Sequence, residues 1–589
     1  MTKISLENWI IDDKLEGLLF FAQTIREMVS RYTIDSYKAP VFNSHSICEE
    51  ILDVIEEIEQ GFLHERGLDP LREELIWNLQ DDPVVRKTLG YRFTPIMEEL
   101  KQADSHKKIQ SIVKPIQNLI ERNYIQEIHN QLIESVKNPK EKEKITQLSK
   151  IFISELVFYG YSQEYLHQEI MYYFFSNQKI STVNQIDIFL KRFSFNKENW
   201  DVYFRGDDNF TYLEKLDIFK DLEILDEKIQ PRKGYPAEIK FFEDNEKFPL
   251  FLLFKNIEAL DPYDARDRCE RILRHINDLS GLSTHREKLK WSSQSLVYSK
   301  TDFFKAIDDY SVMHKVKDSE ICDVKSNIDE LVSILVKLDP ESMYLIWNSL
   351  SMHSGAIESK RSENQLMNLW TALETLLPAP PSQSKTRIVY FLYSFEPFLG
   401  RKYIQKLIKD LLNELRFELG DKLDGFLLKV PVGSSDFEKI SAVISIKENK
   451  PLKDELCLMV GRNFLLRNKI HTLNKKLITK AKILETIETH NKRVRWQLQR
   501  IYRARNLIVH KGGKLIYLDQ LVENLHSYYH SVFSLIQEIQ YDYDNIDTLE
   551  TIFKLVRIEH EAHLNLLKMK EQVDCNKDNF QLLLFCNPK

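Results

Sequence analysis

The sequence predicts a mainly α-helical protein with one small α/β domain, and three observations support this fold class. Glycine, which is unfavourable inside helices, occurs only 16 times in 589 residues. Apolar residues recur every three or four positions in the first 150 residues and again from Ile328 to about Leu567, as in amphipathic helices. Between these regions, short apolar segments are separated by glycine and proline, which is typical of strands.

The chain is too long for a single hydrophobic core, so several domains are expected. A polar segment with a proline at residues 137–144 marks the first boundary. We predict an N-terminal helical region at 1–150, an α/β domain at 151–330 and a C-terminal helical domain at 331–589. The first two regions carry no recognisable catalytic motif. Our hypothesis is that they sense a signal or regulate the third.

Local patterns predict the elements of the first two regions. Apolar residues at helical spacing indicate helices around residues 15–28 and 47–55. In the middle region, alternating or continuous apolar runs predict four strands and one helix. The strands are Trp200–Phe204, Ala237–Phe242, Phe248–Phe254 and Ser295–Tyr298, and the helix is Pro262–Leu279.

The C-terminal region reads as a series of helices. Ser362 and Gln365 fit a capping box that opens a helix ending at Leu377, before three prolines. Its apolar face carries Glu374, an unusual position for an unpaired carboxylate. Further helices are expected at Arg401–Leu419, Lys453–Asn468, Ile478–Glu488, Arg493–His510 and Leu518–Tyr541.

Composition limits the class of protein. The formal net charge of −7 argues against a protein that coats nucleic acid, so any RNA contact should be a local patch. The six cysteines are scattered and form no pairing pattern, as expected for free thiols in a reducing cytosol. No signal peptide is visible, and the apolar runs are too short to cross a bilayer. We therefore expect a soluble, cytoplasmic protein with no membrane partner.

One stretch, Trp496–Gly513, stands out from the acidic chain. Between Thr489 and Leu518 there is no Asp or Glu, and there are eight Lys and Arg residues. Such a patch suits a polyanion, because Lys and Arg displace the counterions of nucleic-acid phosphates. The alternative is an ordinary solvated helix face.

The order Arg505-Asn506-x-x-x-His510 favours chemistry at the end of this stretch. Arginine binds phosphate oxygens, and histidine exchanges a proton near neutral pH. Helix geometry places Arg505 about 140° from His510, whereas Arg503 and Asn506 lie nearer to the histidine's face. Two glycines after the histidine, at 512–513, predict the end of the helix.

These residues resemble a known family. Arg505–His510 is similar to the R-x4–6-H signature of HEPN domains, and the wider segment Arg500–Gly513 is similar to their Apea-like branch. Leu369–Leu377 resembles the helix with an "alE-L" motif early in such domains. The resemblance implies a HEPN helical bundle that dimerises and cuts RNA without a metal or other cofactor.

The resemblance also implies roles for individual residues. His510 would transfer a proton, Arg505 would stabilise the charge of the transition state, and Asn506 would orient the histidine or the substrate. Supporting and RNA-binding roles are expected for a second set of residues. Glu374 would pair with Arg505 or Arg503, and RNA would contact Arg500, Lys511 and Lys514.

The resulting expectation is a metal-independent endoribonuclease that cuts tRNA or other RNA and leaves a 2′,3′-cyclic phosphate. The family association implies a homodimeric abortive-infection toxin in antiviral defence, switched on by a phage-derived activator. The alternative is a non-catalytic RNA-binding or signalling adaptor. His560 and His563 are one residue too close for a zinc-protease motif, and we interpret them as a solvated helix face rather than metal ligands.

Overall fold

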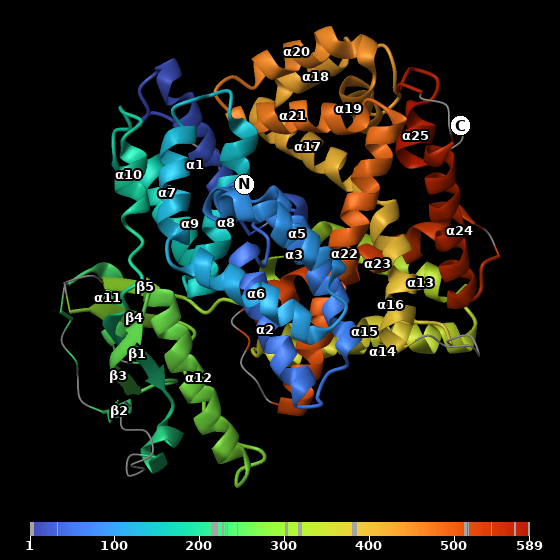
Figure 1. The fold of residues 1–589 in the computed structure, drawn as a ribbon. Helices are drawn as coiled ribbons and strands as arrows, with labels where there is room; N and C mark the ends of the chain where they lie inside the picture. The colour runs from blue at the N-terminus through green and yellow to red at the C-terminus, as the bar shows by residue number, and fades with distance from the viewer. Residues whose placement is uncertain are drawn as a thin grey trace. The chain divides into compact units, whose positions relative to one another are not determined.

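The structure is a computed structural model. It describes residues 5–31, 33–213, 222–226, 229, 231–232, 234–243, 245–300, 304–315, 321–379, 386–511, 515, 517–543, 545–569 and 573–586. The described residues are mainly helical and include one small antiparallel sheet. They form two compact units (Figure 1). Unit 1 contains Met1–Phe152 and Val312–Lys589, and unit 2 contains Ile153–Ser311.

Unit 1 joins the two regions that the sequence predicts as separate N-terminal and C-terminal domains. Its N-terminal helices are α1 (Glu16–Met28), α2 (Ser44–Glu59), α3 (Asp69–Asp81), α4 (Pro83–Leu89), α5 (Phe93–Gln102), α6 (His106–Glu121), α7 (Tyr124–Ser135) and α8 (Lys142–Tyr159), the last of which crosses the boundary between the units. Helix α1 is buried on most of its surface. Gly17 allows this close packing, because a Cβ atom there would lie 2.2 Å from the carbonyl oxygen of Val136.

The remaining helices of unit 1 come from the C-terminal part of the chain. They are α13 (Ile321–Leu335), α14 (Pro340–Glu358), α15 (Ser362–Leu376), α16 (Arg387–Arg401), α17 (Tyr403–Leu419), α18 (Asp421–Leu427), α19 (Asp436–Ser445), α20 (Lys450–Met459), α21 (Phe464–Leu477), α22 (Lys480–Lys511), α23 (Leu518–Asp542), α24 (Leu549–Lys568) and α25 (Phe580–Phe585). Helices α17 to α21 and α25 share one leucine- and isoleucine-rich core. Helices α14, α15, α22 and α23 pack into a bundle, with α15 in contact with each of the other three.

Two predicted boundaries in this region are wrong for identifiable reasons. The helix expected at Lys453–Asn468 is two helices, because Gly461 has a positive φ of 57° and Asn463 caps α21. The break expected between 488 and 493 is absent, and α22 runs through it. There His490 stacks on Tyr403 at 3.6 Å between ring centroids, so tertiary packing continues the helix.

The predicted capping box at the start of α15 is also wrong. The residue before the helix is Arg361, whose side chain makes no cap hydrogen bond. The side-chain amide of Gln365 donates to the carbonyl oxygen of Ser359 at 2.6 Å, and the hydroxyl of Ser362 donates to Asp519. The helix start is therefore fixed by contacts with a turn and with α23.

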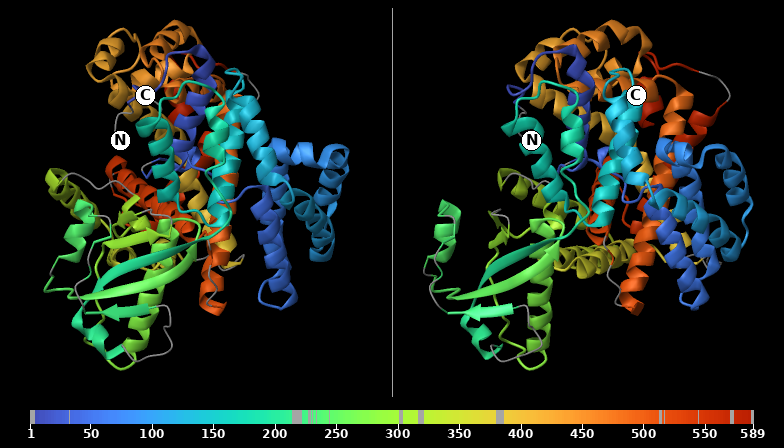
Figure 2. Two further views of the ribbon diagram at one scale, coloured as in Figure 1. Left: turned by 90° about the vertical axis from the view of Figure 1, so that its left-hand side faces the viewer. Right: turned by 60° about the vertical axis from the view of Figure 1, so that its left-hand side comes forward.

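Unit 2 contains the small sheet. Its antiparallel strands are ordered β2-β3-β1-β4-β5. The strands are β1 (Glu198–Gly206), β2 (Leu222–Leu225), β3 (Leu250–Ala259), β4 (Ser295–Ser299) and β5 (Phe304–Ile307), and the helices that belong wholly to unit 2 are α9 (Gln163–Tyr172), α10 (Gln185–Leu190), α11 (Pro236–Phe242) and α12 (Pro262–Gly281). Helix α12 covers one face of the sheet (Figure 2).

Alternate residues of β1 enter different cores, as the two-residue period of a strand requires. Val202 and Phe204 face α12, while Tyr203 faces Phe241 of α11. The segment Ala237–Phe242, predicted as a strand, is the helix α11. Pro236 occupies its first turn, where proline is preorganised for a helix and its missing N–H costs nothing.

Candidate functional site

Helix α22 carries the candidate site and packs along its length in unit 1. Val494, Leu498, Ile501 and Ala504 are buried and recur every three or four residues, so they form the inner face of the helix. This spacing continues to the last turn, where the side chains become half-buried and then exposed. The inner face of the helix is therefore buried along most of its length, and its C-terminal end is accessible to solvent.

Helix α15, which carries the second sequence motif, packs directly against α22. Trp370 of α15 is fully buried and stacks on Phe391 at 4.1 Å between ring centroids. Its ring also lies 5.7 Å, between centroids, from the ring of Tyr502 in α22. The two motifs that the sequence analysis relates to one family are thus neighbours in space.

The arginines in the middle of the cationic stretch contact the N-terminal helices of unit 1. Arg500 is 2% exposed, and its guanidinium donates to Glu50 of α2 at 2.9 Å and to Glu74 of α3 at 2.6 Å. Its charged plane also lies over the ring of Phe42 at 4.5 Å. The expectation that Arg500 contacts RNA does not agree with this environment, because its donors face two carboxylates inside unit 1.

Arg503 shares the same carboxylate. Its guanidinium is buried and donates to Glu50 at 2.9 Å. Burial opposes ionisation of Glu50, but the two guanidinium groups outweigh it and lower the pKa of Glu50. For Glu74 burial prevails over Arg500 and raises the pKa. Burial also disfavours the charge on Arg500, but both carboxylates prevail and raise its pKa.

The absence of acids within the stretch is therefore compensated by acids from other helices. Glu50, Glu74 and, in α16, Glu396 supply them, the last pairing with Arg495 at 3.0 Å. Lys492 and Arg493 remain exposed. The predicted continuous cationic patch is accordingly divided, with its middle neutralised inside unit 1.

The last turns of α22 differ from its middle. Arg505 is half-buried, and its Nη1 donates to Oδ1 of Asn506 at 3.1 Å. Within the described part of the chain, Arg505 has no ion pair, and its buried Nε has no hydrogen-bond partner. Asn506 and His510 are four residues apart and share a helix face, and His510 is exposed. The guanidinium thus lies beside the face that carries the imidazole.

The expected partners of Glu374 are not the observed ones. Glu374 pairs with Arg387 of α16 at 3.0 Å, while Arg503 pairs with Glu50. The structure therefore does not join Glu374 to the arginines of α22. Lys514 and the predicted glycine stop at 512–513 lie outside the described residues, as does the side chain of Lys511.

The histidines of α24 are not a solvated face, so that interpretation is wrong. His560 and His563 are both buried. The side-chain amide of Asn491 lies 3.4 Å from Nε2 of His560, and Nε2 of His563 donates to the carbonyl oxygen of Leu583 at 2.8 Å. The two rings serve packing within the C-terminal helices.

Sequence reasoning missed a different group of histidines. His526 and His530 occupy one face of α23, and His353 of α14 approaches them. The signal in the sequence was the four-residue spacing of His526 and His530, which places two imidazoles on the same side of a helix. The third member comes from a distant segment and has no local signal.

Comparisons with protein-family models, curated proteins and solved structures find no match to this chain. Among the described residues, no helix combines the length and the apolar character that crossing a membrane requires.

Proposed function

We propose that this protein is a metal-independent endoribonuclease whose reaction takes place at the C-terminal end of α22. The observation that carries the proposal is the hydrogen bond between Arg505 and Asn506 beside the exposed His510. A guanidinium with no carboxylate partner among the described residues is available to a phosphate. An exposed imidazole on the neighbouring face is available for proton transfer.

The chemistry uses groups of the RNA and the protein only. The ribose 2′-oxygen attacks the adjacent phosphorus, the bond to the 5′-oxygen breaks, and a 2′,3′-cyclic phosphate and a 5′-hydroxyl result. His510 takes the proton from the 2′-hydroxyl or gives one to the leaving 5′-oxygen. Arg505 stabilises the negative charge that builds on the phosphate oxygens, and Asn506 holds its guanidinium in place.

The arrangement of the two motif helices supports the more specific proposal of a HEPN domain. The helix with the alE-L resemblance, α15, packs on the helix that carries Arg505 and His510, and both belong to one bundle with α14 and α23. We propose the Apea-like branch of that family, on the wording of Arg500–Gly513. Within that branch, the protein would be a cytoplasmic toxin of antiviral defence that cuts tRNA or other RNA after activation by a phage product.

A homodimer is part of this proposal. Helices α13 and α14, together with the residue that follows α13, expose several large apolar side chains, and large exposed apolar patches are typical of surfaces that a partner covers. They are Ile328, Val332, Val336, Tyr344 and Trp347. A second copy that covers them would bring two bundles of this kind together.

The non-catalytic RNA-binding or signalling adaptor is the second candidate, and one observation favours it. Among the described residues, His510 has no hydrogen-bond partner that fixes its ring, whereas general acids and bases are usually oriented by one. In an adaptor, the exposed cations of α22 would hold RNA without cutting it.

Incubation of total RNA with purified protein in EDTA separates the two functions. If the protein is an endoribonuclease, the wild type produces new fragments with 2′,3′-cyclic phosphate ends. The His510→Ala variant should not produce them. The protein is also incubated with the phage product or other activator. RNA binding without new ends under those conditions supports the adaptor. Cleavage that requires added Mg²⁺, which prefers oxygen ligands to histidine, would refute the proposed mechanism.

A further inference from the structure

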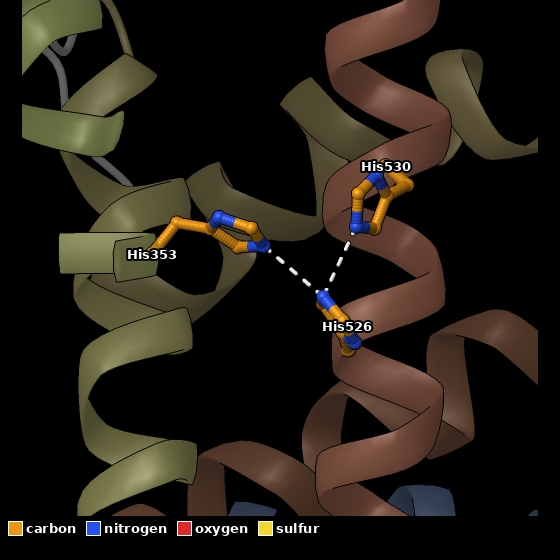
Figure 3. Close-up of side chains that lie close together, drawn as sticks. All are labelled: His353, His526 and His530. Carbon is orange, nitrogen blue, oxygen red and sulfur yellow. Dashed lines mark hydrogen bonds between the residues drawn. The ribbon is translucent and has the colours of Figure 1, made fainter. Parts of the chain in front are cut away.

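Three imidazoles from two helices of unit 1 converge on one point (Figure 3). His353 lies near the end of α14, and His526 and His530 lie on consecutive turns of α23. Nε2 of His526 is 3.0 Å from Nε2 of His353 and 3.0 Å from Nε2 of His530. One nitrogen from each ring lies within 4.8 Å of those of the other two.

We propose that His353, His526 and His530 bind a divalent transition-metal ion of the Zn²⁺ type. Three imidazole nitrogens suit zinc and its first-row neighbours, whereas Mg²⁺ and Ca²⁺ prefer oxygen ligands. With zinc–nitrogen bonds of about 2.0–2.1 Å, tetrahedral geometry separates two ligand nitrogens by about 3.3 Å. Two of the three separations are 3.0 Å and the third is within 4.8 Å, so small movements of the rings bring the three nitrogens to this spacing.

Hydrogen bonding alone explains this arrangement poorly. Nε2 of His526 faces two other ring nitrogens, so it either accepts from both or donates its single proton to one of them. In either case Nδ1 of His526 is buried without a hydrogen-bond partner in the described part of the chain. A cation gives the three converging lone pairs a common partner, which an apolar bundle interior does not.

The surroundings favour neutral rings and leave a route for an ion. Burial lowers the pKa of His526 to about 3 and that of His353 to about 4, so both offer a lone pair at neutral pH. Tyr529 stacks on His353 at 4.5 Å between ring centroids and fixes the plane of that ring. His530 is exposed, so the site opens to solvent on its side.

The three protein ligands leave a fourth position for water, a further side chain or a small ligand. An ion here joins α14 to α23, two helices of the bundle that also contains α15 and α22. We therefore assign the ion a structural role in the bundle. It is not part of the proposed RNA cleavage, whose groups come from α22.

Metal binding by the full-length chain, freed of any histidine tag, tests this site. Metal-free protein is titrated with Zn²⁺ against a chromophoric chelator, and with Co²⁺ while its visible absorption is recorded. We expect one high-affinity ion per chain and the intense visible bands of four- or five-coordinate cobalt. His530→Gln, at the exposed edge, and His353→Gln should each weaken the affinity by about 100-fold or more, because losing even an outer-shell partner costs 10–100-fold.

His285→Gln is the matched control, because His285 is an exposed histidine of unit 2. Circular dichroism verifies that each variant is folded. The site is refuted if the wild type binds no stoichiometric ion, or if both ligand variants that remain folded bind Zn²⁺ as tightly as the control. The readout is metal binding, so the test gives the same answer whether or not the chain cuts RNA.

Discussion

The middle and the end of α22 contain the same residue types in opposite environments. Arg500 and Arg503 are buried and paired with Glu50, whereas Arg505 has no described ion pair and His510 is exposed. In the middle of α22, the arginines form ion pairs that join the N-terminal helices to the C-terminal bundle. At the end, Arg505 is available to a ligand. Arginines of a cationic stretch are therefore available to an anionic ligand only where carboxylates of other helices do not pair with them.

The largest expected effect is on stability, from Arg500→Ala. It leaves Glu74 buried without its cation and Glu50 with only Arg503, and breaking a buried ion pair costs about 3–5 kcal/mol in the free energy of unfolding. Urea unfolding followed by tryptophan fluorescence measures the loss. Arg495→Ala is the matched control, because Arg495 pairs with Glu396 but is 44% exposed. It should cost less than about 1 kcal/mol. Equal losses of stability in the two variants would contradict the distinction between a buried ion pair and an exposed one.

The next effect is on cleavage, from Arg505→Ala. Removing one group that stabilises charge in a transition state slows a reaction by about 10²–10³-fold. The urea midpoint should stay close to that of the wild type, since Arg505 has no described ion pair to lose. Single-turnover cleavage of a defined RNA measures the rate, with Arg505→Lys as a variant that keeps the charge. A normal rate for Arg505→Ala would place the reaction elsewhere.

A third effect tests the packing of the first half of α22 through pH. Burial lowers the pKa of His560, which contacts Asn491 of α22, to about 4 from its ordinary value of 6.5. The folded state therefore favours the neutral ring, so this contribution to stability is complete above pH 6.5 and is lost as the pH falls from 6.5 through 4. By pH 5 the loss is about 2 kcal/mol. Urea unfolding at pH 7 and pH 5 should show a smaller pH dependence for His560→Gln; an unchanged dependence would contradict the assignment.

The smallest effect is expected at the ion pair between Glu374 and Arg387, which the structure has in place of the predicted pair between Glu374 and an arginine of α22. Arg387 is 72% exposed where it meets Glu374, so Arg387→Ala should change the free energy of unfolding by about 0.5 kcal/mol or less. It should leave the cleavage rate unchanged, because neither residue contacts the arginines of α22. A large loss of cleavage in Arg387→Ala would instead tie Glu374 to the reaction.

Much of the fold was predictable because the signals are local. Helical spacing gave α17 and α23 to within two residues at each end, alternation gave the centre of β1, and the strand expected at Ser295–Tyr298 is β4. Errors occurred where a distant contact decides the outcome. The break predicted inside α22 is absent, because His490 stacks on Tyr403 there. The strands β2 and β5 were not predicted, because they are short and have no distinctive pattern.

The candidate site was predictable only in part, for the same reason. The four-residue spacing of Asn506 and His510 places both on one face without any tertiary information. The fate of Arg500 depends on Glu50 and Glu74, more than four hundred residues away in the chain, and no local pattern reports them. The third histidine of the proposed metal site, His353, lies 173 residues before His526 and likewise has no local signal.

The most direct test of the division of α22 is the cleavage rate of His510→Ala on a defined RNA in EDTA, beside the wild type. We predict a loss of about 10²-fold or more, with an unchanged urea midpoint, because His510 is exposed and transfers a proton in the proposed reaction. Cleavage at the wild-type rate by the folded variant would contradict it.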